Sequence, residues 1–332
     1  MAGLNNLTVF NEFVYTAMTE VLMQQVDLFN SASRNTIQLS TAAHLGDYSE
    51  STMWAKISGL VRRRDAYGSG AVAAKEMSHL NDVGVKIAAG TPPIEIDPSQ
   101  MLWIQRSPEE MAAVIGQQLA IDALADMLNT SIGSCYAALA QADTGTAGSV
   151  VYDGTAGVMS PTALANGSRL FGDRYSDIVA WVMHSKVLHD HYIGNLANVE
   201  RLFQFGSVNI IGDAFGRVFV VSDSSSLIAT TPVPDEYHTL GLTAGAIRCD
   251  QNNDFISNIE TSNGDENILR TFQAEWSWNL SIKGFKWDKT NGGASPDDAA
   301  LILGTNWDGI DNLTAVSAEE VKRLAGIVVD TQ

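Results

Sequence analysis

Apolar side chains recur at intervals of three and four residues over about residues 9–29, a pattern that predicts an amphipathic helix near the start of the chain. Such a helix either packs on its own domain or forms an arm that reaches a neighbouring subunit, and the pattern agrees with both readings. The apolar stripe consists of Phe10, Val14, Ala17, Met18, Val21, Leu22 and Phe29.

The following segment, residues 31–98, carries no apolar period long enough to build a core. NTIQLSTAAHLGDYSESTMWAKISG and VGVKIAAGTPPIEIDPS predict short strands, and RRRDAYGSGAVAAKE lies between them. A stretch of this length without its own core is either functional or supported by another surface. We expect a long hairpin with a glycine-containing tip that needs a partner surface.

RSPEEMAAVIGQQLAIDALADMLNTSIGSCYAALAQAD gives the strongest local signal. Ser107 is the expected N-cap, Pro108 fits the first helical position, and Glu110 completes a capping box. Apolar residues continue at steps of three and four as far as Leu139, without a proline. The pattern predicts one helix of about 30 or more residues, about 45–50 Å long, which would act as a spine.

Beyond the spine the pattern predicts a mixture of helices and strands. Ser160 and Pro161 begin a helix that is expected to end at Gly172, and DIVAWVM then predicts a buried strand. HSKVLHDHYIGNLAN predicts a helix, SVNIIGDAFGRVFVVSD a hairpin, and the strictly alternating TFQAEWSWNLSIKGFKWD a long strand. The face of this strand expected to be buried carries Phe272, Ala274, Trp276, Trp278, Leu280 and Ile282.

Composition narrows the class of protein. The chain of 332 residues has a formal net charge of −18, which argues against binding nucleic acid through a basic patch. Its two cysteines, Cys135 and Cys249, form no C-x-x-C pair and are expected to be buried thiols. The N-terminus does not resemble a secretion signal, and no apolar run approaches the ~20 residues of a membrane helix. We therefore expect a soluble cytoplasmic protein without membrane contact.

The candidate chemistry lies in residues 178–196, where His184, His189 and His191 accompany Asp190. Their spacing differs from the i, i+4 pairs of helical zinc sites, and no H-E-x-x-H or C-x-x-C motif completes a ligand set. Nucleophile elbows and phosphate loops with the required spacing are also missing from the sequence. We predict no catalytic residue, metal or cofactor. A metal-dependent hydrolase that uses His184, His189 and Asp190 is the alternative from a different class.

The order of the parts resembles the major capsid protein of tailed double-stranded DNA bacteriophages, the Hong Kong 97-type fold. An arm, an extended loop, a spine helix, a strand–helix unit, a hairpin and a closing strand follow one another, and VFNEFVYTAMTEVLMQQVDLFN is most like members from short-tailed phages. In that family an acidic residue before an apolar strand ending in Val-Met-His-Ser recurs, as does a later Gly-x-x-Val-x-Val-x-Asp-like strand. The matching residues are Asp177, Val182, Met183, His184 and Ser185, and then Gly216 to Asp223.

The resemblance implies an α+β fold and assigns the segments of the chain. Residues 1–30 would be an N-terminal arm and 31–98 the extended loop over a neighbouring subunit. Residues 99–149 would be the peripheral domain with the spine, 150–240 the axial domain, and 241–290 the return strands of the peripheral domain. Residues 291–332 match nothing in the family and stay unplaced. The loop residues expected to contact a neighbouring subunit are Trp54, Arg62, Arg63, Arg64 and Tyr67.

The implied function is a structural, non-enzymatic shell subunit. Pentamers and hexamers would form an icosahedral head around double-stranded DNA, assembled in the bacterial cytoplasm and retained in the virion. The implied partners are a separate scaffolding protein, a portal protein and a decoration protein. Some members of the family are cross-linked through lysine, but Lys56, Lys75 and Lys86 match no such position, so no cross-link is predicted. An encapsulin-type compartment is the alternative with the same fold, and the amphipathic N-terminal helix favours the phage head.

Overall fold

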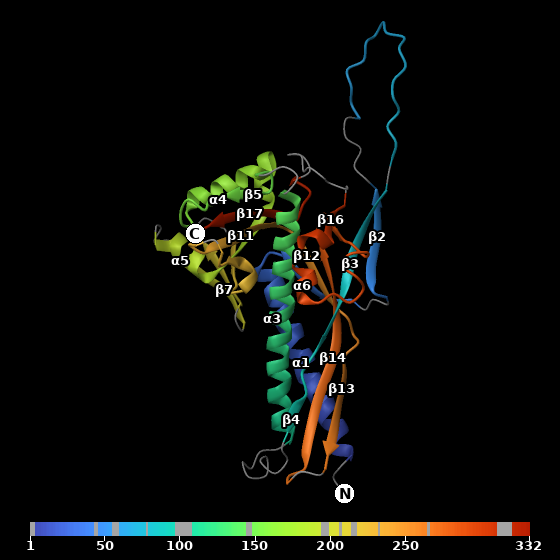
Figure 1. Cartoon of the computed structure of the whole chain (residues 1–332), viewed down its shortest axis with the longest axis vertical. Coiled ribbons are helices and arrows are strands. Elements are labelled where there is room, and N and C mark those ends of the chain that lie inside the picture. Colours follow the sequence, from blue (N-terminus) through green and yellow to red (C-terminus); the bar gives the residue numbers. More distant parts are fainter. Residues whose placement is uncertain are drawn as a thin grey trace.

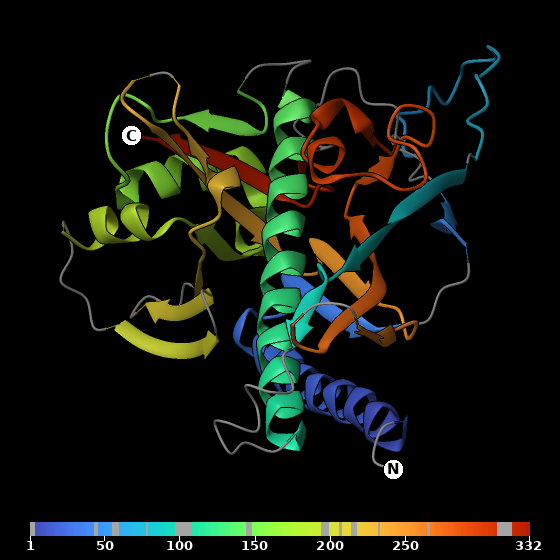
Figure 2. The same ribbon diagram turned by 60° about the horizontal axis from the view of Figure 1, so that its bottom comes forward.

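Two sheets lie on either side of a long central helix, and a hairpin extends beyond the body of the molecule (Figures 1 and 2). This is a computed structural model. The residues that it describes are 4–42, 46–54, 60–77, 79–96, 108–143, 148–193, 199–205, 208–213, 218–231, 233–263, 266–310 and 321–332.

The central helix is α3 (Pro108–Asp143), 36 residues long, which confirms the predicted spine. The expected cap, Ser107, lies outside the described residues. By length and composition alone α3 could cross a membrane, so the expectation that no stretch approaches that limit is wrong. In the structure many apolar side chains of α3 lie in the core instead. They include Ala120, Leu124, Leu128, Ile132, Cys135 and Leu139.

The N-terminal helix α1 (Leu4–Ala32) packs against α3, so the predicted amphipathic helix is confirmed and one of its faces is covered by its own chain. Gly116 makes this contact close: a Cβ atom there would lie 2.9 Å from the carbonyl oxygen of Val14. The buried face of α1 carries Val14, Met18, Leu22 and Phe29, whereas the side chain of Phe10 lies outside the described part.

The first sheet has seven strands in the order β1-β12-β14-β3-β2, with β13 and β4 also paired to β14. The central strand β14 is antiparallel to β12, β3, β13 and β4, and β1 is parallel to β12. The bounds of the strands are β1 Ile37–Thr41, β2 Tyr48–Trp54, β3 His79–Gly90, β4 Ile94–Ile96, β12 Ile247–Gln251, β13 Ile256–Ser262 and β14 Leu269–Ile282.

The alternation along β14 predicts its buried face correctly, because all six apolar positions are buried. The opposite face is less exposed than a period of two implies. Ser277 and Asn279 are also buried, and the Asn252 side chain donates to the Ser277 hydroxyl at 2.9 Å and accepts from the Asn279 amide at 2.9 Å. Hydrogen bonding thus satisfies polar groups that the pattern alone would leave facing water.

Residues 31–98 do not all depend on a partner surface, and that expectation is wrong for the base of the hairpin. β1 and β3 pair with strands of the same chain, and their apolar side chains join its core. The buried side chains are Ile37, Leu39, Val83, Val85 and Ile87. The outer part of the stretch, 60–77, is exposed at every described residue, as are residues 50–54 at the end of β2.

The second sheet has eight strands in the order β5-β17-β11-β6-β9-β8-β7, with β10 paired to β11. The predicted strand–helix unit is confirmed as β6 and α5, and the predicted hairpin as the antiparallel pair β8 and β9. The elements are β5 Val151–Asp153, α4 Pro161–Ser168, η1 Arg169–Asp177, β6 Ile178–Met183, α5 Ser185–Ile193, β7 Val199–Phe205, β8 Val208–Asp213, β9 Val218–Val221, η2 Ser225–Leu227, β10 Ile228–Ala229, β11 Glu236–Thr243 and β17 Gly326–Thr331.

The start of α4 is as predicted: Ser160 accepts a hydrogen bond from the Ala163 backbone N–H at 3.2 Å, with Pro161 at the first helical position. The helix ends at Ser168 rather than Gly172. Gly172 lies within η1 with φ of +58°, a backbone angle that favours glycine.

The described parts of the C-terminal segment, 291–310 and 321–332, belong to the body of the molecule. Its last strand, β17, lies between β11 and β5 in the second sheet, antiparallel to the first and parallel to the second. Before it come β15 Phe285–Trp287, α6 Asp298–Leu301, η3 Gly304–Asn306 and β16 Trp307–Gly309. β15 pairs with β16, where Trp287 and Trp307 meet edge to face at 4.9 Å.

Candidate assembly surfaces

The loop tip, defined as residues 60–77, is the most exposed part of the described chain. It lies between β2 and β3 in the sequence, past the last pair of their antiparallel ladder, Trp54 with His79, and it extends beyond the body (Figure 1). Val61 is 94% exposed and Tyr67 is 99% exposed. Apolar and aromatic side chains at such exposure are typical of a surface that another molecule covers.

All five predicted contact residues are exposed in the structure. Trp54 is 71% exposed at the base of the hairpin, and Arg62, Arg63, Arg64 and Tyr67 lie in the loop tip. The tip holds four basic residues and two acidic ones, a net charge of +2 in a chain of −18. It is therefore opposite in sign to the molecule as a whole, which favours contact with an acidic surface.

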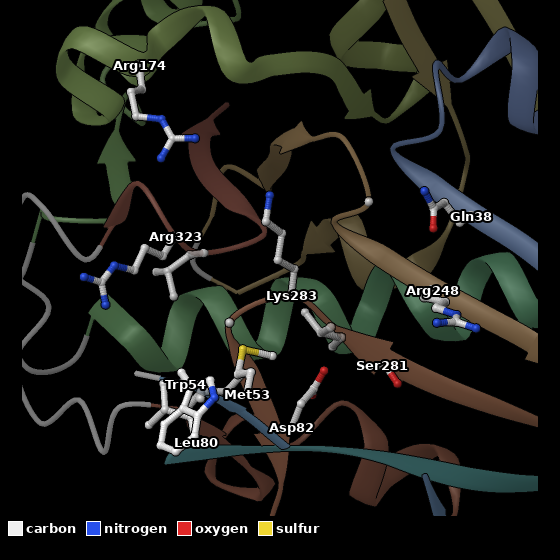
Figure 3. A pocket seen from close by; sticks show the side chains of 15 residues that line it. Gln38, Met53, Trp54, Leu80, Asp82, Arg174, Arg248, Ser281, Lys283 and Arg323 are labelled. Atoms are coloured by element: carbon white, nitrogen blue, oxygen red, sulfur yellow. The ribbon is translucent and has the colours of Figure 1, made fainter. Parts of the chain in front are cut away.

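A cavity of about 580 Å³, the loop-root pocket, lies where the hairpin meets the body. Figure 3 shows Met53, Trp54 and Leu80 grouped on the hairpin side, with Arg174 and Arg323 across the cavity from them. The cations that line the pocket are Arg174, Arg248, Lys283 and Arg323, and Asp82 is the acidic residue among its described lining.

Burial shifts the pKa values of two charged groups in the loop-root pocket. Desolvation raises the pKa of Asp82 above its ordinary value, and the nearby Arg248 offsets part of this effect. Desolvation lowers the pKa of Lys283, and Arg174 adds to the effect by repulsion. The Lys283 ammonium donates to the Thr243 hydroxyl at 3.0 Å. The pocket thus offers positive charge and apolar surface, a combination suited to an acidic segment.

A second cavity, of about 770 Å³, lies beside α1, and we call it the α1 groove. One wall is α1 from Tyr15 to Asn30, and the other is formed by residues 39–41 and 251–255. Tyr15 crosses one end, where its hydroxyl donates to the Asn253 side chain at 3.1 Å and its ring lies 5.3 Å from that of Phe255. The described lining includes the carboxylate of Asp27 and no Lys, Arg or His.

The histidines of residues 178–196 occupy three different environments. His184 is half-buried with its Nε2 atom 3.4 Å from a carboxylate oxygen of Asp223, and His189 is exposed. His191 is buried against the ring of Phe219 at 5.4 Å. Within the described ranges no group of three His, Cys, Asp or Glu side chains could hold a metal ion. The structure therefore gives the metal-dependent hydrolase no assembled site.

The two short motifs that carry the family resemblance meet in space. β6 runs parallel to β9, so Val182 pairs with Val220 and Met183 with Val221. Asp223, just after β9, then accepts a hydrogen bond from the backbone N–H of Ser185 at 3.1 Å, which satisfies the N-terminus of α5. A cap between segments 38 residues apart explains why both motifs end in polar residues.

A buried polar network that the sequence did not reveal joins Tyr136, His238 and Asp330. The Nδ1 atom of His238 lies 2.7 Å from the Asp330 carboxylate, and its Nε2 atom lies 3.0 Å from the Tyr136 hydroxyl. A carboxylate only accepts, so Nδ1 donates to Asp330, and Nε2 of the neutral ring then accepts from Tyr136. These residues come from α3, β11 and β17, and neither described cavity includes them. The network therefore serves as a structural link.

Comparison with known proteins agrees with this architecture. A sequence model of the family described as major capsid protein 13-like matches residues 6–328. A search of curated proteins finds no match. The capsid asymmetric unit of cyanophage Pam1 is similar with a TM-score of 0.51 at 10% identity, covering 89% of this chain and 88% of that one. A chain of Mycobacterium phage Bobi is similar with a TM-score of 0.48 at 11% identity, covering 91% and 90%.

The likeness to the Pam1 capsid shows a shared α+β fold, the Hong Kong 97-type capsid fold, and the family match extends over nearly the whole chain. The chain therefore belongs to the major capsid protein 13-like family of bacteriophage capsid proteins.

Proposed function

We propose that this major capsid protein assembles as pentamers and hexamers into the icosahedral head that encloses the double-stranded DNA genome of its phage. The observation that carries this proposal is the loop tip, where all described side chains face solvent although several are apolar or aromatic. A surface of this kind is stabilised when another subunit covers it. The contact residues that we propose are Trp54, Arg62, Arg63, Arg64 and Tyr67.

The proposed segments follow the two sheets. Residues 31–98 act as the extended loop, with the base of the hairpin held in the first sheet and the tip free to reach a neighbouring subunit. Residues 150–240 act as the axial domain, which gathers around the symmetry axes. Residues 1–30, which form most of α1, act as the N-terminal arm. Residues 99–149 with the spine α3, and the return strands in residues 241–290, act as the peripheral domain. Contacts between unlike surfaces of identical subunits close into rings when the rotation permits, as pentamers and hexamers require.

The subunit is proposed to act without catalysis and without a cofactor. Its partners are copies of itself, a separate scaffolding protein, a portal protein and a decoration protein, and assembly takes place in the bacterial cytoplasm. The net charge of −18 is consistent with a container whose wall does not hold the packaged DNA by general attraction.

Expression of the full chain, alone and together with candidate scaffolding proteins, tests the proposal. Sedimentation followed by negative-stain electron microscopy is expected to show closed shells far larger than one subunit, with five-fold and six-fold clusters in averaged images. Compact monomers or dimers under all of these conditions would contradict the proposal.

A further inference from the structure

The loop tip has a chemically matched surface on the same protein. We propose that the loop tip of one subunit docks into the α1 groove of a neighbouring copy. This inference rests on the proposed function, because it names the surface that the loop covers when the shell forms.

The apolar surfaces of the tip and the groove are complementary. The tip exposes Leu60 at 71%, Val72 at 56% and Met77 at 62%, in addition to Val61 and Tyr67. Met23, Val26 and Phe255 keep apolar surface exposed in the groove, above a floor of the buried Met18, Leu22 and Leu39. Met23 is itself 64% exposed, so apolar surface reaches the rim. A volume of about 770 Å³ can accept several side chains, and covering apolar surface on both partners is favourable.

The positive charge of the loop tip favours docking at the α1 groove over docking at the loop-root pocket. Helix α1 contains no Lys, Arg or His, and Glu20, Met23 and Asp27 follow one another at intervals of three and four on its exposed face. Arg62, Arg63 and Arg64 would therefore meet carboxylates at the α1 groove. At the loop-root pocket the same arginines would meet four cations. Asp177 and Asp250 pair with Arg174 and Arg248, and Asp82 adds a third carboxylate, so the charge there stays positive and is repulsive.

The shape of the subunit makes the contact intermolecular. In Figure 1 the loop tip extends beyond one end of the long axis, whereas α1 runs from the opposite end toward the middle of the molecule. A tip therefore points away from the groove of its own chain. A contact between two different surfaces at different ends of identical subunits is heterologous, the type that generates rings.

Disulfide trapping tests the contact in assembled full-length protein. Tyr67→Cys combined with Met23→Cys is expected to give dimers and longer ladders on non-reducing gels after mild oxidation, at least ten-fold more than Tyr67→Cys combined with Arg174→Cys in the loop-root pocket. The single variants measure the background. Burial raises the pKa of the native thiols Cys135 and Cys249 to about 12, so both stay protonated and compete little.

A charge swap gives a second readout if the double cysteine variant fails to assemble. Arg62→Glu, Arg63→Glu and Arg64→Glu together are expected to lower shell yield at least five-fold, and adding Glu20→Lys with Asp27→Lys is expected to restore at least half of it. The matched control adds Asp122→Lys with Asp126→Lys, two exposed acidic residues of α3, to the same triple variant and is expected to restore nothing.

The outcomes separate the two proposals. Shells that cross-link through Arg174→Cys, that cross-link through neither partner, or that are rescued by the α3 control would overturn the groove assignment and leave the proposed function intact. Failure of the unmodified chain to form shells under any condition would instead count against the proposed function.

Discussion

His238 links three parts of the chain that are far apart in sequence. It lies on β11 opposite Asp330 of β17, and its ring stacks on Tyr136 of the spine at 4.2 Å. Burial, followed by the charges of Asp330 and Glu236, raises the pKa of Tyr136 well above its ordinary value, so the phenol stays protonated and can donate. The Tyr136 hydroxyl and the Oδ1 atom of Asp330 both have the imidazole as a partner, so the loss of the histidine affects two polar groups at once.

Replacing His238 with alanine should destabilise the unassembled subunit by about 2–4 kcal/mol, because Asp330 and the Tyr136 hydroxyl would both lose a buried partner. Urea unfolding followed by circular dichroism measures this. His189→Ala, at an exposed position of α5, is the matched control and should change the free energy of unfolding by less than about 0.5 kcal/mol. Equal unfolding midpoints for the two variants would show that the network contributes nothing.

At the scale of elements, Asp223 fixes where α5 begins. Its carboxylate accepts from the N–H of Ser185 at 3.1 Å and lies 3.4 Å from Nε2 of His184. The hydrogen bond to the Ser185 side chain, the largest effect, lowers the pKa of Asp223 below its ordinary range, and desolvation opposes it. A lowered pKa means that the ionised group stabilises the fold. This contribution is present above the pKa of the unfolded chain and disappears as the pH falls through the lower pKa of the folded state.

Asp223→Ala should therefore lower the free energy of unfolding by about 1 kcal/mol at neutral pH, the usual contribution of a helix cap. The difference from the unmodified chain should shrink as the pH is lowered into the range where the carboxyl group protonates. Thermal unfolding at a series of pH values measures it. Glu260→Ala, at an exposed position of β13, should change stability by less than about 0.5 kcal/mol at neutral pH. A difference for Asp223→Ala that stays constant across the acid range would refute the electrostatic part of the argument.

Elements with a continuous period could be predicted from the sequence, and elements that depend on distant partners could not. In α1, α3 and β14 apolar residues recur at a regular spacing, which places them on the buried face of each element. β1 has only five residues, and it is held by parallel pairing with β12, in which Ile37 faces Ile247. A local sequence pattern does not indicate which strand, more than two hundred positions away, will pair with this one. For this reason the sequence pattern indicates no core at the base of the hairpin, although the side chains there are buried.

At the scale of the whole molecule, dependence on distant partners also explains why the position of β17 and the α1 groove could not be predicted from the sequence. The sequence pattern leaves β17 unplaced, although the family match to residues 6–328 covers part of it, and the structure shows it as an interior strand of the second sheet with β11 and β5 on either side. The α1 groove combines residues 15–30 with residues 251–255, a set that only the folded chain brings together. The loop tip could be predicted, because it is a single continuous segment whose glycines, arginines and tyrosine are visible in the sequence.

The loop tip should be dispensable for the fold and required for the shell. Replacing residues 60–77 with Asn-Gly removes only exposed side chains, and the ladder between β2 and β3 up to Trp54 and His79 remains. The free energy of unfolding of the subunit should change by less than about 0.5 kcal/mol, because no core side chain is lost. Sedimentation should show no closed shells.

An equally long Gly/Ser segment in place of the same residues keeps the reach of the loop and removes its side chains. It should also fail to form shells, because apolar and charged contacts, rather than length, hold the tip to a neighbouring subunit. Shells at normal yield from the Gly/Ser variant would show that reach alone is sufficient. A subunit that unfolds more easily without its tip would show that residues 60–77 stabilise their own chain, and the loop would then have no need of a neighbouring subunit.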